Sequence, residues 1–237
     1  SRIPLGRHSI NYFMSQNCKL TNNHGGNLKQ AEERFGSPAQ GWLDLSTGVN
    51  LRSYPKVKLT NLSLQMLPQQ NQMEMLLAAA RSLYRVPPSM EIIAAPGSQV
   101  LIQCLPTLSS DRHVSIVGPT YEEHAKSWAE GGHKVSIVDN LGDIQGADIA
   151  VIVNPNNPNG KITSCNELLC LANKKIDRKG LLVIDEAFAD AEPDVSIIPH
   201  LTNDTTVVLR SFGKFFGLPG VRLGFAVGAP LLIDQLR

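Results

Sequence analysis

Short segments rich in Val, Ile and Leu alternate with segments of helical periodicity from about residue 69 onward, and this alternation constrains the fold more than any other feature. Several segments have the length and composition of buried strands, and Leu223–Val227 is a further candidate. They are Glu91–Ala95, Val114–Val117, Lys134–Val138, Asp148–Val153, Leu181–Ile184 and Thr205–Leu209. Such alternation is typical of an α/β domain whose mostly parallel sheet is covered by helices on both faces. We therefore expect a three-layer α/β/α fold.

The helical segments lie between these strands. Apolar residues recur at helical spacing over residues 69–85, and a Pro-Pro pair ends the run. Further helices are expected after Gly97-Ser98-Gln99, after Thr120-Tyr121 and from about Ser164. Ser164 and Glu167 have the spacing of a capping box, which supports a helix start at this point.

The two ends of the chain differ from this central pattern. Residues 1–66 are rich in Asn, Gly, Ser and Pro, so we expect an N-terminal arm and loops there and one large domain over residues 67–237. The first residue is Ser rather than Met, which favours an extension over residues 1–13. Leu231–Arg237 has the pattern of a helix start at which the sequence stops, so we expect the domain to be incomplete at its C-terminal end.

Composition argues against several classes of protein. The chain has 22 Lys and Arg against 21 Asp and Glu, so no overall field favours nucleic acid. Its apolar runs are far shorter than the roughly 20 residues that cross a bilayer, so we expect no membrane span. At this length a core forms without a metal, and we expect no metal site. The cysteines form no C-x-x-C pair, which favours a reduced cytoplasm, and are Cys18, Cys104, Cys165 and Cys170.

Polar residues follow the expected strands at their carboxyl ends, where such sheets bind ligands. Asp185 directly follows Leu181–Ile184, where a carboxylate either meets a cationic partner or caps the next turn. Lys214 follows Thr205–Leu209 among Phe and Gly residues. Partial desolvation there would lower the pKa of its amine and make it a nucleophile toward carbonyls, although a lone lysine is more often a solvated surface residue.

A second group of residues fits a flat anionic ligand. Gly97-Ser98-Gln99 offers backbone N–H groups and a hydroxyl at a helix start, although Ser is also a routine N-cap. Ser211 and Arg222 can reach the same anion, and Arg222 is equally well explained as an exposed salt-bridge partner. Tyr121 can cover a ring or be an ordinary buried tyrosine, and Asn157 can bind a ring oxygen or only shape a tight turn. Together these groups meet the requirements of pyridoxal phosphate.

Longer motifs carry a resemblance to a known family. They are His24-Gly25-Gly26-Asn27-Leu28, Trp42 through Asn50, Pro96 through Gln99, Pro119 through His124, Asn154 through Gly160, Val183 through Phe188, and Leu209 through Phe225. In this order, over roughly residues 22 to 230, they resemble the fold-type-I pyridoxal-phosphate enzymes. Within these the chain is most similar to the threonine-phosphate decarboxylase family of cobalamin biosynthesis, kin of the histidinol-phosphate aminotransferases. The His-Gly-Gly and Leu-Ser-Thr-Gly segments favour the decarboxylase branch.

The resemblance implies pyridoxal 5'-phosphate as cofactor and a role for each residue of the site. Lys214 would be the Schiff-base lysine and a proton donor or acceptor, Asp185 would pair with the pyridine nitrogen, and Tyr121 would stack on the ring. Asn157 would meet the phenolic oxygen of the ring. The residues implied to hold the phosphate are Gly97, Ser98, Gln99, Ser211 and Arg222.

The same resemblance implies a homodimer with shared active sites and a second, smaller C-terminal domain that is absent here. Tyr54 would reach the cofactor phosphate of the partner subunit. His24 and Asn50 would lie on the substrate side, where His24 is equally well explained as a solvated loop histidine.

The implied activity is decarboxylation of L-threonine O-3-phosphate, an amino acid phosphate, to (R)-1-amino-2-propanol phosphate. A histidinol-phosphate-type aminotransferase and a truncated cofactor-binding protein without activity are alternatives. They stay open because the arginine that grips the substrate carboxylate in this family would lie beyond Arg237. A nucleotide-binding protein has less support, since the chain contains neither G-x-G-x-x-G nor the P-loop pattern.

Overall fold

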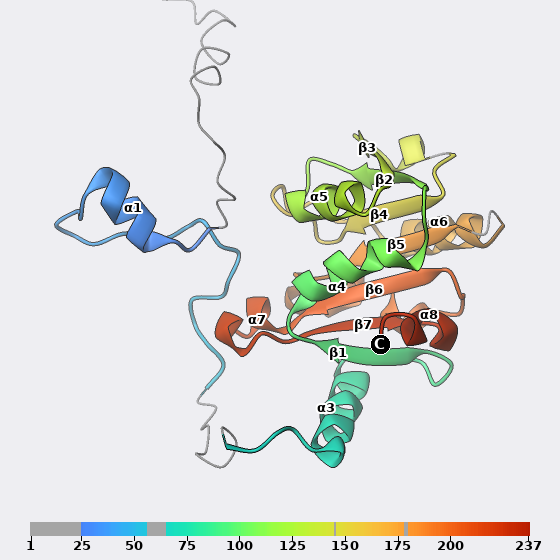
Figure 1. The fold of residues 1–237 in the computed structure, drawn as a ribbon, viewed down its shortest axis with the longest axis horizontal. Coiled ribbons are helices and arrows are strands. Elements are labelled where there is room, and N and C mark those ends of the chain that lie inside the picture. The colour runs from blue at the N-terminus through green and yellow to red at the C-terminus, as the bar shows by residue number, and fades with distance from the viewer. Residues whose placement is uncertain (1–24, 56–64, 145, 178–179) are drawn as a thin grey trace, which may run out of the picture. The chain divides into compact units, whose positions relative to one another are not determined.

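The structure is a computed structural model that describes residues 25–55, 65–144, 146–177 and 180–237 (Figure 1). By its internal contacts the chain divides into two units, residues 1–48 and residues 49–237. The first unit contains α1 (Leu28–Phe35), which is capped where Gln30 N donates to Asn27 Oδ1 at 3.1 Å. The domain boundary expected after residue 66 and the extension over residues 1–13 remain predictions.

The second unit is built on a seven-stranded sheet with the order β1-β7-β6-β5-β4-β2-β3. Strands β2 to β6 pair in parallel with their neighbours, whereas β7 runs antiparallel to both β6 and β1. This confirms the mostly parallel sheet. The strands are β1 (Glu91–Ala95), β2 (His113–Val117), β3 (Lys134–Val138), β4 (Ile149–Val153), β5 (Leu181–Asp185), β6 (Thr206–Ser211) and β7 (Gly224–Gly228).

Helices cover both faces of the sheet, which confirms the three layers (Figure 1). One core contains Leu101, Trp128 and Ile233 from the helices α4, α5 and α8, and the other contains Ala80 and Leu168 from α3 and α6. The helices are α3 (Gln70–Leu83), α4 (Ser98–Cys104), α5 (Glu122–Glu130), α6 (Cys165–Asp177), α7 (Phe212–Phe215) and α8 (Pro230–Asp234). Short 3-10 helices span Leu105–Leu108, Leu141–Ile144, Ala189–Ala191, Pro193–Val195, Ile198–His200 and Pro219–Val221.

Local signals placed most of these elements correctly. The capping box before α6 is confirmed, because Ser164 N donates to Glu167 Oε2 at 3.0 Å and Glu167 N donates to Ser164 Oγ at 3.3 Å. Asp185 is the last residue of β5 and pairs in register with Val153 and Leu209. We expected it just after the strand, and its place inside the ladder fixes its backbone on both sides.

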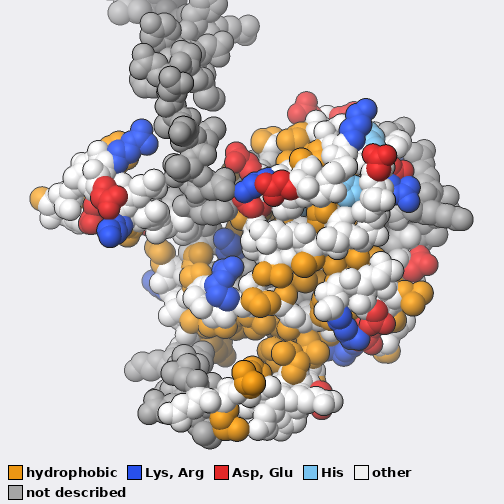
Figure 2. Space-filling view, in the orientation of Figure 1, with side chains coloured by type: hydrophobic (Ala, Val, Ile, Leu, Met, Phe, Trp, Pro, Cys, Tyr) orange, Lys and Arg blue, Asp and Glu red, His pale blue; other side chains and the backbone are white. Residues whose placement is uncertain are grey.

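The surface carries apolar side chains of several helices. Figure 2 shows hydrophobic side chains on the face turned to the viewer, over α4, α8 and α3. Val100, Leu231 and Leu83 are among the exposed large hydrophobic residues.

No helix among the described residues is both long and apolar enough to cross a membrane. The homodimer implied by the resemblance remains a prediction.

A buried ionic cluster connects β5, β6 and α3 on one face of the sheet. The guanidinium of Arg210 donates to Glu186 Oε2 at 2.9 Å, contacts Asp190, and lies 4.4 Å from the ring centroid of Tyr84. Ile197 N also donates to Glu186, at 2.9 Å. Burial raises the pKa of the Glu186 carboxyl and raises the pKa of Tyr84 to about 12. Each buried charge is therefore stable only while its partners are present, because their attraction offsets the loss of hydration.

We expect Arg210→Ala to lower the free energy of unfolding by about 3–5 kcal/mol, because it leaves two buried carboxyls without their cation. Urea-induced unfolding measures the loss. The difference in unfolding free energy between Arg210→Ala and the wild type becomes smaller as the pH falls, since protonated carboxyls carry no charge to bury. Asp194→Asn is the control, because its ion pair with Arg85 is exposed to solvent and contributes little to stability. Equal losses in both variants would contradict a stabilising role of the cluster.

Candidate functional site

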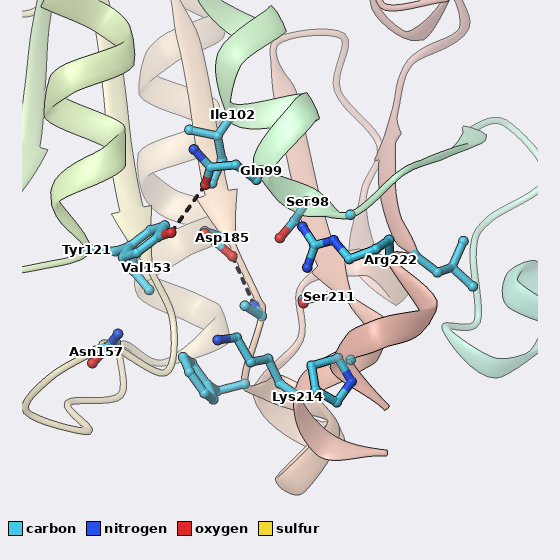
Figure 3. A pocket seen from close by; sticks show the side chains of 16 residues that line it. Ser98, Gln99, Ile102, Tyr121, Val153, Asn157, Asp185, Ser211, Lys214 and Arg222 are labelled. Atoms are coloured by element: carbon cyan, nitrogen blue, oxygen red, sulfur yellow. Dashed lines mark hydrogen bonds between the residues drawn. The ribbon is translucent and has the colours of Figure 1, made fainter. Parts of the chain in front are cut away.

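A cavity of about 140 Å³ opens at the edge of the sheet where the parallel strands end (Figure 3). It is lined by residues that follow β1, β2, β4 and β6, by the last residues of β5 and β6, and by residues that precede β7. The predicted site residues that line it are Gly97, Ser98, Gln99, Tyr121, Asn157, Asp185, Ser211, Lys214 and Arg222. The structure thus brings together residues spread over more than half of the chain.

Lys214 and Asp185 project into the same space in this cavity (Figure 3). Lys214 is half-buried on α7, with Nζ 5.7 Å from the ring centroid of Phe188. Burial lowers the pKa of the Lys214 amine, Asp185 opposes this shift, and Arg222 adds to it. A larger share of the amine is therefore neutral, and only the neutral amine attacks a carbonyl carbon.

The Asp185 carboxylate is buried and held by two hydrogen bonds. Oδ1 accepts from Ala187 N at 3.0 Å, and Oδ2 lies 2.9 Å from Nε2 of His124. Because an ionised carboxylate only accepts, Nε2 of His124 carries the proton of this bond. The carboxylate keeps lone pairs for a donor inside the cavity.

His124 is a residue of this site to which the sequence motifs did not assign a role. His124 is fully buried in the first turn of α5, and Nδ1 has no hydrogen-bond partner within the described residues. Its ring centroid lies 6.3 Å from that of Tyr121, in an edge-to-face arrangement. The available signal was its spacing of three residues from Tyr121, which places both side chains on one side of the helix start.

Tyr121, which follows the carboxyl end of β2, is held by a chain of hydrogen bonds. Its hydroxyl donates to Gln99 Oε1 at 3.2 Å, and Gln99 Nε2 donates to Glu123 Oε2 at 2.8 Å. Burial raises the pKa of Tyr121, so the ring keeps its phenolic proton at neutral pH. Gln99 therefore acts here as a link between α4 and α5, and both polar ends of its amide are occupied.

At the Arg222 end of the cavity, glycines let the backbone come close to neighbouring residues. Gly97 has φ +92°, and a Cβ on it would lie 2.8 Å from Nη2 of Arg222. Arg222 itself has φ +52°, an uncommon conformation for a residue with a side chain, which directs its guanidinium beside Ser98 (Figure 3). A Cβ on Gly224 would overlap Ser98 N. The small residues allow Arg222, Ser98 and the start of α4 to meet.

Several polar side chains in the cavity have unused hydrogen-bonding capacity. They make no hydrogen bond or ion pair with any described residue, and they are Ser98, Asn157, Ser211, Lys214 and Arg222. Ser211 is 8% exposed and lines the cavity, where a ligand or water can pair with its hydroxyl. Hydroxyl, amide, ammonium and guanidinium donors around one space suit an anionic ligand that also carries oxygen acceptors. No metal-binding group of His, Cys, Asp or Glu occurs in the described part of the chain.

The remaining predicted residues lie elsewhere. Tyr54 has an exposed ring in edge-to-face contact with Phe216, and it does not line the cavity of its own chain. Asn50 does not line it either, because its amide donates to Phe215 O at 2.9 Å. His24 lies outside the described residues. The substrate-side roles of Asn50 and His24 and the partner-side role of Tyr54 remain predictions.

Comparison of the sequence with known proteins finds one matching family model and relatives that share most of this chain. The family model of aminotransferase class I and II matches residues 59–237. The threonine-phosphate decarboxylase of Sinorhizobium sp. is 39% identical over 207 residues, which cover 86% of this chain and 62% of that protein. The threonine-phosphate decarboxylase of Pseudomonas aeruginosa is 36% identical over 219 residues, which cover 90% of this chain and 64% of that protein. The chain thus spans less than two thirds of the length of these relatives.

A solved structure supports the fold assignment. The histidinol-phosphate aminotransferase of Sinorhizobium meliloti, in complex with pyridoxal-5'-phosphate, superposes with a TM-score of 0.61 at 22% identity. The match covers 69% of this chain and 50% of that one. At this identity the similarity concerns the fold, which is that of the second unit.

The electrostatics of the cavity predict that Asp185→Asn lowers the pKa of Lys214 further. The negative charge of Asp185 favours the ammonium form, so its removal makes the proton easier to lose. Competitive acylation over a range of pH, read by peptide mass spectrometry, reports this pKa, with the exposed Lys174 as reference in the same digest. An unchanged pKa of Lys214 would show that Asp185 does not act on this amine, and a rise would contradict the expected direction.

Proposed function

Because the chain belongs to the class I and II aminotransferase family, we propose that its cavity binds pyridoxal 5'-phosphate and carries out the chemistry of a pyridoxal-phosphate enzyme. The observation that carries this proposal is the set of unpaired donors opposite the buried Asp185 carboxylate. The Sinorhizobium meliloti relative, with which the chain shares its fold, contains this cofactor.

The donors that line the cavity would suit the phosphate and the phenolic oxygen of this ligand. Ser98, Ser211, Arg222 and the backbone N–H groups at the start of α4 would hold the phosphate, with Gly97 leaving room for it. Asn157 would donate to the phenolic oxygen, and Tyr121 would cover the ring. Gln99 would contribute by holding Tyr121 in place.

The reactive groups lie at the other end of the cavity. When bound, pyridoxal phosphate supplies a protonated ring that accepts the electron pair of a bond broken at the substrate α-carbon. Asp185 would hold the proton on the ring nitrogen, and His124 would fix the carboxylate in place through its Nε2 hydrogen bond. Lys214, with its lowered pKa, would handle the proton at the α-carbon: it would donate one there after CO₂ leaves, or remove the α-proton if the reaction is a transamination.

We further propose that the reaction is decarboxylation of L-threonine O-3-phosphate to (R)-1-amino-2-propanol phosphate. The similarity to two threonine-phosphate decarboxylases over most of the chain supports this substrate. The groups that orient the substrate decide the outcome, because the bond held perpendicular to the ring is the one that breaks. A histidinol-phosphate-type aminotransferase is the second candidate, because the motifs of the chain also resemble this kin family.

A homodimer with shared sites accounts for the position of Tyr54. Its ring is 58% exposed and lies outside the cavity of its own chain, so it is free to reach the phosphate of a partner subunit. Asn50 would approach the substrate only from such a shared arrangement or after a local rearrangement, because its amide is bound to Phe215 O.

Borohydride reduction tests the cofactor site. After incubation with pyridoxal phosphate and reduction, we expect one phosphopyridoxyl group on Lys214, located by peptide mapping. Lys214→Arg should abolish this label, whereas Lys174→Arg on the exposed face of α6 should leave it unchanged. Labels spread over exposed lysines, with none on Lys214, would rule out the proposed cofactor site.

Release of CO₂ tests the reaction. The chain loaded with pyridoxal phosphate should release CO₂ from L-threonine O-3-phosphate without any keto acid, and Lys214→Ala should lower the rate by at least about 100-fold. Conversion of the cofactor to its amine form by histidinol phosphate, without CO₂ release, would favour the aminotransferase. Lys214 labelling with turnover of neither substrate would identify a cofactor-binding protein without activity.

A further inference from the structure

A segment far away in sequence caps the helix that carries Lys214. Residues 50–54, named here the N-terminal strap, lie against the carboxyl end of α7. Asn50 N donates to Lys214 O at 3.0 Å, Asn50 Nδ2 donates to Phe215 O at 2.9 Å, and Tyr54 N donates to Phe216 O at 2.8 Å. Successive carbonyls at the end of α7 thus accept from donors in the strap, and Lys214 O also accepts from Gly217 N at 3.3 Å.

The fit between strap and helix is tight. Gly217, just after α7, has φ +62°, and a Cβ on it would lie 2.6 Å from Asn50 O and 2.8 Å from Ser53 Cα. Asn50 Oδ1 accepts from Arg52 N at 2.9 Å, which folds the strap into a turn. Both polar atoms of the Asn50 amide are therefore used within this contact.

The helix needs such support because it is very short. An isolated helix of four residues does not form on its own in water, and its last carbonyls have no partners within the helix. At its other end, Phe212 N donates to Leu223 O at 3.1 Å. The backbone of Lys214 is thus held between β6 and Leu223 on one side and the strap on the other.

We propose that Asn50 is a positioning residue for Lys214, acting through the backbone of α7 rather than by contact with the substrate. The proposal rests on the proposed role of Lys214 as the amine that bonds to the cofactor. Asn50 fixes the position of the helix end through its hydrogen bonds to the carbonyls of Lys214 and Phe215. This position keeps the Lys214 side chain half-buried in the cavity with Asp185 and Phe188. Loss of the contact lets the helix end move, and water then reaches the amine.

The test compares Asn50→Ala and Asn50→Asp with Leu51→Ala, whose side chain is 82% exposed and lies in the same strap. Asn50→Asp keeps the acceptor for Arg52 N but loses the donor to Phe215 O, so it separates the turn from the cap. Hydrogen exchange at Tyr54 N reports whether the strap stays docked. Competitive acylation without any cofactor reports the pKa of Lys214, on which Asp185 and Arg222 are the charged groups that act.

We expect Asn50→Asp to exchange Tyr54 N roughly five-fold faster, as the loss of one neutral hydrogen bond implies, and Asn50→Ala, which loses two, to exchange it at least as fast. The pKa of Lys214 should rise toward its ordinary value, because burial lowers it and the variants reduce that burial. Gly217→Ala, which pushes the strap away while Asn50 is intact, should act in the same direction. Leu51→Ala should change neither quantity.

Two results would overturn the proposal: an unchanged pKa of Lys214 in Asn50→Ala, or a wild-type value in Asn50→Asp. The first would limit Asn50 to shaping its own loop, and the second would assign the effect to the turn. Because both measurements are made without pyridoxal phosphate, they stay informative even if reduction places no phosphopyridoxyl group on Lys214. Failure of the proposed function and failure of this inference are therefore distinguishable.

Discussion

The register of the central parallel strands is the constraint on which the site depends. Val153, Asp185 and Leu209 pair across β4, β5 and β6, so β4 and β5 end at one level of the sheet, and β6 continues past it to Ser211. The segments that carry Asn157 and Lys214 start from these strand ends and reach the same cavity. A shift of one residue in β5 would turn Asp185 to the other face and put Ile184 or Glu186 in its place. The chemistry of the cavity therefore depends on backbone pairing more than on any single side-chain contact.

The end of β5 places one carboxylate on each face of the sheet. Asp185 meets His124 of α5 on one face, and the next residue, Glu186, meets Arg210 on the other. Each is almost fully buried, so each needs its own partner to offset the loss of hydration. Arg210 directly precedes Ser211, which lines the cavity. The ionic cluster on one face thus immobilises the same strand ends that present the site on the other.

The features of the fold and the site that depend on local sequence pattern could be predicted from the sequence. Strand composition and the position of polar residues after strands predicted the sheet and nine residues of the cavity, because parallel strands bring their carboxyl ends together without further information. The antiparallel direction of β7 carried no such signal, since a short apolar run reads the same either way. The contact of His124 with Asp185 depends on how α5 packs on the sheet. The bond from Asn50 to Phe215 spans 165 residues and depends on the path of the whole chain, so only the structure reveals it.

The charges of the cavity are coupled to one another. Among the described residues that line it, Asp185 carries the negative charge and Lys214 and Arg222 the positive ones. Burial and Arg222 lower the pKa of Lys214, whereas Asp185 raises it. An anion held beside Arg222 would act on Lys214 in the same sense as Asp185, because it would offset the repulsion between the two cations. Binding at the Arg222 end of the cavity is therefore linked to the protonation of the amine at the other end. By linkage, deprotonation of Lys214 would weaken the hold on that anion.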